Sequence, residues 1–297
     1  MKTNKLGRTG IDISAITYGG IVSAGFYDNA DYPELGQPAS DRFVAYAVEH
    51  GVNYFDVAPS YGNAQAQLGN SLRPYRDRVT LACKTNKRDR AAAEVELHES
   101  LKLLHTDRFD VYQLHGISSM DEVERAFVPG GVMELMREVK EKGIAAHIGF
   151  TAHDEDAALR MIELYDFETV LFPFNWFMHM AHGMGARLLE AARAKGMGVL
   201  CMKAFIERRW ESPEERAASA FPKSWCKPID VEDEAFGLAA MRYALSLGVD
   251  TLIPPGNFPS FQFAVEHIDA ALAQPLAAAD RALLEAKLQT VKGKEFF

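Results

Sequence analysis

Short apolar runs alternate with amphipathic segments along almost the whole chain. The apolar runs, rich in Val, Ile and Phe, lie at 13–20, 52–59, 79–85, 109–116, 145–152, 169–176, 197–205 and 249–256. Runs that are apolar on both faces are typical of strands in a parallel sheet. Between them, residues 41–51, 91–106, 131–143, 154–166, 185–196 and 235–248 carry apolar side chains at helical spacing. The pattern therefore predicts eight β-strands that alternate with helices.

Eight strand–helix units in 297 residues favour a closed (β/α)8 TIM barrel, a fold that occupies about this length as one domain. Spacing alone leaves an open, doubly wound sheet as the alternative. No linker or low-complexity segment divides the chain, so we predict a single domain over residues 1–297.

Two segments interrupt the repeat. Residues 5–14 contain two short alternating runs around Thr9-Gly10, which predicts an N-terminal β-hairpin that caps one end of the barrel. Residues 206–234, between the seventh and eighth predicted strands, are much longer than an ordinary connection. Loops of that length are often functional, although the sequence does not indicate the role of this one.

Composition and charge exclude several classes of function. The net charge is -9 and no Lys/Arg run supplies a concentrated basic face, so we expect no nucleic-acid partner. No segment approaches the roughly 20 apolar residues of a membrane span. The first residues lack the apolar region of a secretion signal, and a cytoplasmic location is expected.

The cysteines and histidines do not suggest a metal site. Cys83, Cys201 and Cys226 are too few and too scattered for a disulfide framework or a structural zinc site. His179 and His182 have a spacing that suits a metal, but no acidic or cysteine partner lies nearby in the sequence. We therefore expect these two histidines in a loop or at the start of a helix, and no bound metal.

Polar side chains gather where the predicted strands end, which is where the chemistry of such barrels is found. Asp56 and Tyr61 follow the second strand, Lys84 ends the third and His115 ends the fourth. Further along the chain, the corresponding positions are Thr151, Asn175, Lys203 and Gly256. Singly, each has a structural explanation, such as a turn cap or a buried histidine. Together, the first four form a group that can transfer a proton.

The expected chemistry follows from the residue types. A phenol has a pKa near 10, and a neighbouring ammonium, here Lys84, would lower it, while Asp56 would keep Lys84 charged and oriented. His115 could donate a hydrogen bond to the same substrate oxygen. This arrangement suits the reduction of a carbonyl, in which a cofactor supplies a hydride while Tyr61 supplies the proton.

These residues resemble the motif of the aldo-keto reductase family. The pattern D-x-A-x-x-Y-G-x-x-x-x-x-L-G appears as Asp56, Ala58, Tyr61, Gly62, Leu68 and Gly69, and the family's catalytic Lys and His match Lys84 and His115. Residues 6–20 also look like the family's opening hairpin and first strand. The resemblance implies a (β/α)8 barrel that binds a nicotinamide dinucleotide at the carboxyl ends of its strands.

The resemblance also indicates a set of cofactor contacts, several of which depart from the family pattern. The positions are Gly19, Gly20, Ile21, Thr151, Ala152, Asn175, Met202, Lys203, Phe205, Gly256, Asn257, Phe258, Gln262 and Glu266. Thr151-Ala152 stands where the family has Ser-Asn, Met202 where an aromatic residue is common, Phe258 where an Arg often meets the 2'-phosphate, and Glu266 where Asn is common. Lys203, Lys223 and Lys227 are candidate replacements for the missing contacts, and the alternative for the two loop lysines, Lys223 and Lys227, is a solvated side chain. NADP(H) is favoured over NAD(H), with weaker discrimination than usual.

We therefore predict an NAD(P)(H)-dependent oxidoreductase acting on an aldehyde, ketone or sugar-like carbonyl, or on the matching alcohol. The loops at 26–32, 116–131 and 208–228 mix aromatic and polar residues and suit a polar ligand. Two alternatives remain open. One is an isomerase or lyase on the same barrel, and the other is a binding module that senses the nicotinamide redox state.

Overall fold

The computed structural model describes residues 1–24 and 35–294, and its centre is one sheet of eight parallel strands. Neighbours in the sheet follow the chain: β3 (Tyr18–Gly19), β4 (Tyr54–Asp56), β5 (Thr80–Thr85), β6 (Phe109–Ile117), β7 (Ala145–Ala152), β8 (Thr169–Phe172), β9 (Gly198–Met202) and β12 (Thr251–Ile253). All eight predicted strands are present. The two edges of the sheet meet through a parallel bridge between Ile16 and Leu252, in which Thr17 N donates to Leu252 O at 2.9 Å. The closed barrel is confirmed, and the open sheet is excluded.

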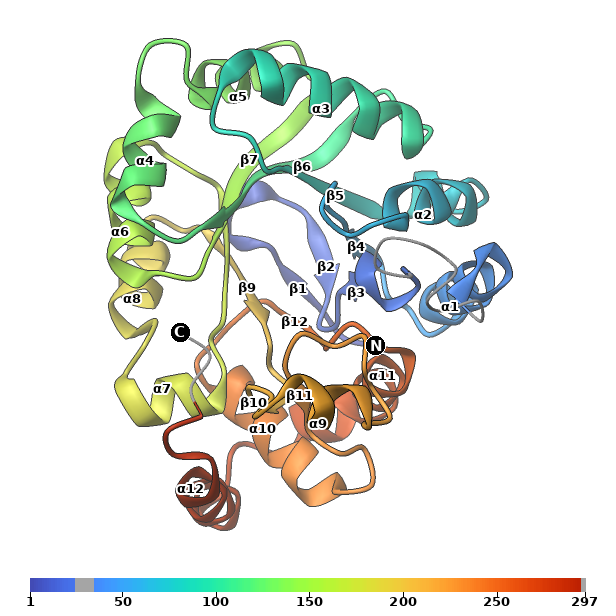
Figure 1. Cartoon of the computed structure of the whole chain (residues 1–297), viewed down its shortest axis with the longest axis vertical. Helices are drawn as coiled ribbons and strands as arrows, with labels where there is room; N and C mark the ends of the chain where they lie inside the picture. Colours follow the sequence, from blue (N-terminus) through green and yellow to red (C-terminus); the bar gives the residue numbers. More distant parts are fainter. Residues whose placement is uncertain (25–34, 295–297) are drawn as a thin grey trace.

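Helices surround the strands on the outside of the barrel (Figure 1). They are α1 (Gln37–Glu49), α2 (Ala64–Leu72), α3 (Arg90–Leu103), α4 (Met120–Phe127), α5 (Val132–Glu141), α6 (Glu155–Leu164), α7 (Trp176–His182), α8 (Ala186–Ala194), α10 (Glu234–Ser246), α11 (Phe258–Ala273) and α12 (Ala278–Val291). Every predicted helix is present within a few residues. The pattern did not predict α2, α4, α7, α11 or α12. His179 and His182 lie in the short helix α7, and the His179 ring is hydrogen-bonded to Tyr243 Oη at 2.8 Å.

The predicted N-terminal hairpin is confirmed. Strands β1 (Thr3–Lys5) and β2 (Asp12–Ser14) pair antiparallel, with the short helix η1 (Gly7–Thr9) in the turn between them. Leu6 and Ile13 are fully buried against side chains of the barrel interior, including Tyr54. Gly7 N donates to the Asp250 carboxylate just before β12 at 3.2 Å. The hairpin thus closes the end of the barrel at which the parallel strands begin.

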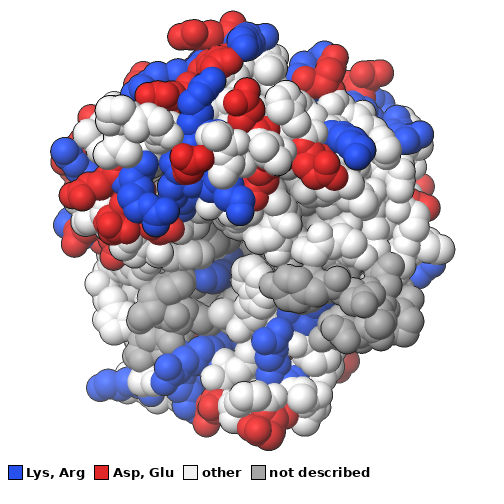
Figure 2. All heavy atoms as spheres, turned by 45° about the horizontal axis from the view of Figure 1, so that its top comes forward, with Lys and Arg blue, Asp and Glu red and all other residues white. Residues whose placement is uncertain are grey.

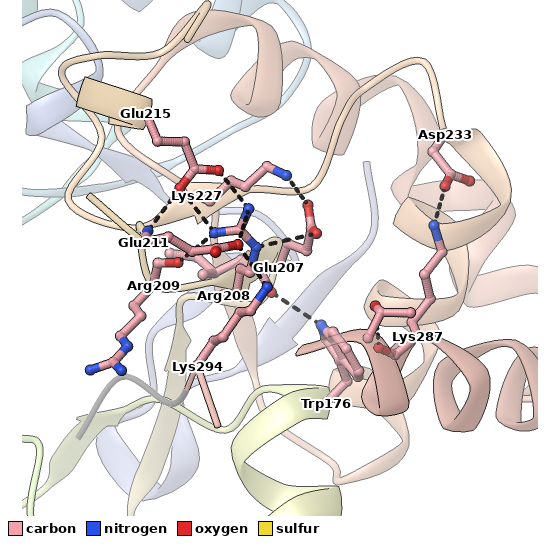
Figure 3. Close-up of polar contacts among 12 residues, drawn as sticks. Trp176, Glu207, Arg208, Arg209, Glu211, Glu215, Lys227, Asp233, Lys287 and Lys294 are labelled. Carbon is pink, nitrogen blue, oxygen red and sulfur yellow. Dashed lines mark hydrogen bonds and ion pairs between the residues drawn. The ribbon is translucent and has the colours of Figure 1, made fainter. Parts of the chain in front are cut away.

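The long connection after β9 has a structure of its own. Strand β10 (Ile206–Arg208) pairs with β11 (Lys227–Pro228), and helix α9 (Pro213–Ala217) lies between them in the chain. Arg208 binds Glu215 through two hydrogen bonds of 2.5 and 3.1 Å (Figure 3). The Glu211 carboxylate, 3.2 Å from Arg208, also binds Lys294 Nζ at 2.6 Å. These ion pairs attach the connection at 206–234 to the turn that follows α12.

Two surface properties bear on possible partners. Among the described residues, no helix has both the length and the apolar character needed to cross a membrane. Figure 2 shows acidic and basic side chains interspersed over the helices of one face, which is hollowed near its middle.

Candidate active site

A buried ion pair joins two adjacent strands at their carboxyl ends. Asp56 is the last residue of β4 and Lys84 lies near the end of β5, and their side chains are 3% and 0% exposed. Lys84 Nζ donates to Asp56 Oδ2 and, at 3.3 Å, to Val57 O. Burial lowers the pKa of Lys84, but the negative charge of Asp56 and its hydrogen bond with Lys84 outweigh that effect and raise the pKa. The ammonium is therefore retained at neutral pH.

Tyr61 lies over this ion pair on the turn that leads from β4 into α2. Lys84 Nζ is 5.5 Å from the centre of the Tyr61 ring. Gly62, the next residue, has φ +57°, a left-handed conformation that favours glycine and lets the chain turn into the helix directly after the phenol. Burial raises the pKa of Tyr61 above 10, and the positive charge of Lys84 opposes the rise. The phenol is therefore protonated at neutral pH.

His115 faces the same phenol from the end of β6. The rings of Tyr61 and His115 meet edge to face, with centroids 5.6 Å apart. Burial lowers the pKa of His115 well below its usual range, and the positive charges of Lys84 and Arg88 lower it further. The imidazole is neutral at pH 7. The structure thus brings together all four side chains that the sequence motif indicated.

A pocket of about 120 Å³ opens beside Tyr61 at the carboxyl ends of the strands. Its walls include Ile21, Tyr61, Met202, Lys203, Trp225 and Gly256. Four of these, Ile21, Met202, Lys203 and Gly256, were predicted as cofactor contacts. Burial lowers the pKa of Lys203 to about 8. A Cβ on Gly256 would come within 2.6 Å of the Ile21 side chain, so this wall of the pocket admits only glycine without rearrangement.

The connection at 206–234 forms one side of this pocket. Trp225 is 53% exposed and its ring meets the Tyr61 ring at 6.2 Å. Lys223 Nζ donates to the backbone oxygens of Ile21, Val22 and Ala24 at 2.6, 2.8 and 2.9 Å, which binds this connection to the segment after β3. Lys227 is 3.2 Å from the Glu207 carboxylate. Both lysines therefore have structural contacts within the protein.

Several predicted cofactor residues lie near the strand ends but do not line the pocket. Asn175 caps α7 by accepting a hydrogen bond from Met178 N at 2.9 Å, and its Nδ2 has no partner among the described residues. This fully buried donor suits a carboxamide oxygen. Thr151 Oγ1 instead accepts from Gly116 N at 2.7 Å. Ala152 is fully buried beside it.

The residues predicted around the far end of the cofactor lie on or next to α11. Phe258 stacks on Phe43, with ring centroids 4.0 Å apart. Gln262 donates to the Glu266 carboxylate at 2.7 Å, which leaves an acidic group at this end of the site. Asn257 caps the helix through Ser260 N, at 2.8 Å.

The other predicted contacts occupy different surroundings. Phe205 is buried and packs against Phe263. Gly19 and Gly20 are buried at the end of β3. The predicted ligand loop at 26–32 lies outside the described residues. Among the described residues, no group of three or more His, Cys, Asp or Glu is placed to hold a metal ion.

Three polar residues that the sequence pattern did not indicate contact His115. Asn86 Oδ1 lies 2.6 Å and Ser60 Oγ 3.3 Å from His115 Nδ1. Arg88 donates to His115 O at 2.7 Å. The available signal was the polar stretch directly after Lys84, since residues that follow a strand end share the rim of the barrel with the motif residues.

A parallel barrel with an Asp–Lys pair beneath a tyrosine and a histidine defines the class of protein. The family model described as "Aldo/keto reductase family" matches residues 29–229 of the 297. The chain belongs to the aldo/keto reductase family, which confirms the resemblance seen in the motif. Membership indicates an oxidoreductase that uses a nicotinamide cofactor.

Curated relatives have low identity. Aldo-keto reductase YhdN of Bacillus subtilis is 28% identical over 195 residues, which cover 60% of this chain and 55% of the relative. Uncharacterized oxidoreductase YqkF of the same organism is 25% identical, and the match covers 60% of this chain and 57% of that protein. L-galactose dehydrogenase of Arabidopsis thaliana is 26% identical, with 81% and 79% covered. The match thus spans just over half the length of each Bacillus protein.

Solved structures show the same fold. The holo form of aldo-keto reductase AKR11C1 from Bacillus halodurans superimposes with a TM-score of 0.71 at 18% identity, and the match covers 97% of this chain and 96% of that one. At this identity the similarity establishes the fold alone.

Proposed function

We propose that the protein transfers a hydride between a nicotinamide cofactor and an aldehyde, ketone or sugar-like carbonyl, or the matching alcohol, with Tyr61 as the general acid or base. The observation that carries the proposal is the buried Asp56–Lys84 pair directly beneath the Tyr61 ring. Burying an ion pair is costly, and the position of this pair beside a phenol gives it a use in proton transfer.

The roles of the four side chains follow from their contacts. A bound nicotinamide cofactor would supply a hydride in the reducing direction. Tyr61 would give its proton to the oxygen of the carbonyl as that oxygen becomes an alkoxide. Lys84 stabilises the tyrosinate that remains, and Asp56 holds the ammonium in place. His115 contacts the substrate beside the reacting carbon. In oxidation, Tyr61 must first lose its proton, so that direction should accelerate as the pH rises towards the raised pKa of the phenol.

The cofactor assignment rests on Asn175, whose buried Nδ2 has no partner among the described residues and suits the oxygen of a carboxamide. The preference for NADP(H) remains a prediction from the family resemblance. The acidic Glu266 and the apolar Phe258 offer no positive charge to a 2'-phosphate, so discrimination against NAD(H) should be weak.

A sugar-like or other polar substrate is supported by the aromatic wall of the pocket. The exposed Trp225 ring lies beside Tyr61, and an aromatic face of this kind packs well against the apolar side of a polyol. One relative is named an L-galactose dehydrogenase, which points to the same class of substrate.

The test is a Tyr61→Phe variant, assayed by absorbance at the reduced-nicotinamide band with a panel of carbonyls. Phe keeps the ring packing and removes the proton donor, so turnover should fall by about 100-fold to 10,000-fold while cofactor affinity is unchanged. Tyr75→Phe, near the amino end of β5 and away from the pocket, is the matched control and should keep full activity. A Tyr61→Phe enzyme with most of its activity would contradict the mechanism. Bound nucleotide without turnover of any carbonyl in the wild type would favour a redox sensor instead.

A further inference from the structure

The backbone at His115 leaves the regular pairing between β6 and β7. Between two of their pairs, β6 has one more residue than β7, and the pairs are Leu114–Phe150 and Ile117–Ala152. Gly116, inside this bulge, has φ +67°, a left-handed conformation that favours glycine. A bulge redirects the side chains next to it, and this one lies where the His115 ring faces Tyr61.

Two side chains bind the peptide group that joins His115 to Gly116. Gly116 N donates to Thr151 Oγ1 at 2.7 Å, and Arg88 Nη2 donates to His115 O at 2.7 Å. Thr151 is 1% exposed and the Arg88 side chain 5%. The N–H and C=O of a trans peptide point in opposite directions. The two contacts therefore hold this peptide from both sides and fix the direction in which the His115 side chain leaves the backbone.

Arg88 reaches His115 from the turn that follows β5, and the same turn also touches the ring. Asn86 Oδ1 lies 2.6 Å from His115 Nδ1, and Asn86 N donates to the Glu96 carboxylate of α3 at 2.7 Å. Arg88 O accepts a hydrogen bond at 2.8 Å from Val132 N, at the beginning of α5. The turn is therefore fixed to two helices, and it contacts the histidine at both its backbone and its ring.

The Arg88 guanidinium has few partners for a buried charge. Its Nη2 also contacts Glu122 Oε1 of α4 at 3.3 Å, while Nε and Nη1 have no hydrogen-bond partner among the described residues. Burial lowers the pKa of Arg88, although the charge of Glu122 opposes this. Replacement of a buried charge by an apolar side chain of similar size is often neutral for stability, or better. What an apolar residue could not supply at this position is the hydrogen bond to His115 O.

We propose that Arg88 is a positioning residue, which fixes the His115–Gly116 peptide against Thr151 so that the His115 ring is held facing Tyr61. The inference rests on the proposed function and deepens it, because the histidine then meets the substrate in one fixed orientation. Arg88 is not among the described residues that line the pocket, so it acts through His115 alone. A misplacement of about 1 Å in an active site can cost about 100-fold. Arg88→Leu should therefore lower kcat/KM by about 10-fold to 100-fold.

A double-mutant cycle with His115→Ala tests whether Arg88 acts through the histidine. Steady-state kinetics are measured for the wild type, the two single variants and the double variant, with glyceraldehyde or, if the wild type reduces it faster, another carbonyl of the panel. When His115 is already Ala, Arg88→Leu should change kcat/KM by less than about 2-fold. A merely structural role would lower kcat/KM by the same factor in both backgrounds. Cofactor affinity, titrated separately, should be the same in the wild type and Arg88→Leu.

Arg76→Leu is the matched control, because Arg76 makes the same kinds of contact at the opposite end of the barrel. Its guanidinium donates to Val79 O at 3.1 Å and to Arg108 O at 3.2 Å, and it lies 3.2 Å from the Asp110 carboxylate. This variant should keep the kcat/KM of the wild type. Arg88→Lys keeps a charge and a donor but lacks the planar fork, so it should recover part of the activity that Arg88→Leu loses. If Arg88→Leu does not fold, as judged by urea unfolding, Arg88→Lys takes its place in the cycle, with a smaller loss that should also vanish beside His115→Ala.

The outcomes separate this inference from the proposed function. A loss in the Arg88 variant that disappears in the His115→Ala background supports the inference. Equal losses in the two backgrounds, or an Arg88→Leu enzyme as active as the wild type, overturn the role of Arg88 while hydride transfer stands. Failure of the wild type to reduce any carbonyl of the panel with either cofactor overturns both.

Discussion

Replacement of Lys84 by Met should leave a carboxylate buried without its partner. The Asp56 and Lys84 side chains are 3% and 0% exposed, and Asp56 Oδ1 has no hydrogen-bond partner among the described residues. Loss of one member of a buried pair typically costs ~3–5 kcal/mol in the free energy of unfolding. Met is close to Lys in shape, so little of this cost should come from packing.

The cost has an upper limit that depends on pH, because Asp56 can take up a proton instead of remaining charged. Burial already raises the pKa of Asp56 in the wild type, where the Lys84 charge opposes the rise, and removal of that charge raises it further. From an ordinary pKa near 3.9, protonation costs about 4 kcal/mol at pH 7 and about 1.5 kcal/mol at pH 5. A raised folded-state pKa means that the variant is most stable at low pH and loses stability as the pH rises.

Urea unfolding followed by circular dichroism at pH 5 and pH 7 measures this effect. The stability difference between wild type and Lys84→Met should shrink by up to about 2.5 kcal/mol from pH 7 to pH 5. The double variant Lys84→Met/Asp56→Asn has no carboxylate at this position, so its difference from the wild type should change much less with pH. If the Lys84→Met difference is the same at both pH values, Asp56 does not carry the unpaired charge and the reasoning fails.

Three further predictions concern the cofactor, a close helix contact and a half-buried carboxylate. Titration with both cofactors should show a preference for NADP(H) over NAD(H) below about 100-fold, or about 2.7 kcal/mol, because Glu266 is acidic. A larger preference for NADP(H) would reveal an unexpected cation at the 2'-phosphate. Gly69→Ala should lower the free energy of unfolding, measured with urea, by ~1–3 kcal/mol, because its Cβ would lie 2.2 Å from Leu103 O. Gly19→Ala, whose nearest contact is at 3.4 Å, should cost clearly less. Equal losses in the two variants would contradict this. Although burial raises the pKa of Glu168, hydrogen bonds from a histidine, a backbone N–H and a lysine bring it to about 2. The stability advantage of the wild type over Glu168→Gln should therefore be present above about pH 4.5 and decline as the pH falls towards 2, and a constant difference would disprove it.

The fold was predictable because its strands are buried on both faces. Such strands appear as uninterrupted apolar runs, and eight of them alternating with helical patterns match few architectures. The helices that the pattern did not predict lack a clear helical signal, each for a different reason. Helix α2 is hidden within the motif that begins at Asp56, and α7 has only seven residues. Helix α11 begins with Phe258-Pro259, which reads as a turn, although proline is well suited to the first positions of a helix.

The motif located the four central side chains, but their surroundings depend on contacts between distant segments. Glu96 lies in the middle of a helix, where a solvent-exposed role is the ordinary expectation for a glutamate. Only the folded structure shows that it reaches back to Asn86. Lys223 was a candidate cofactor contact, yet its ammonium binds backbone oxygens about 200 positions earlier in the chain. Sequence spacing contains no information about such pairs.

The bridge between Ile16 and Leu252 has a consequence for how the protein is made. These two residues are the last partners needed to close the sheet, and 235 residues separate them. A ribosome adds roughly 5–20 residues per second, so β3 waits on the order of 10 seconds or more for β12 to be synthesised. Until then, β3 exposes an unpaired edge, the kind of surface to which other strands add. The nascent chain should therefore be most prone to aggregate, and most dependent on chaperones, before β12 leaves the ribosome.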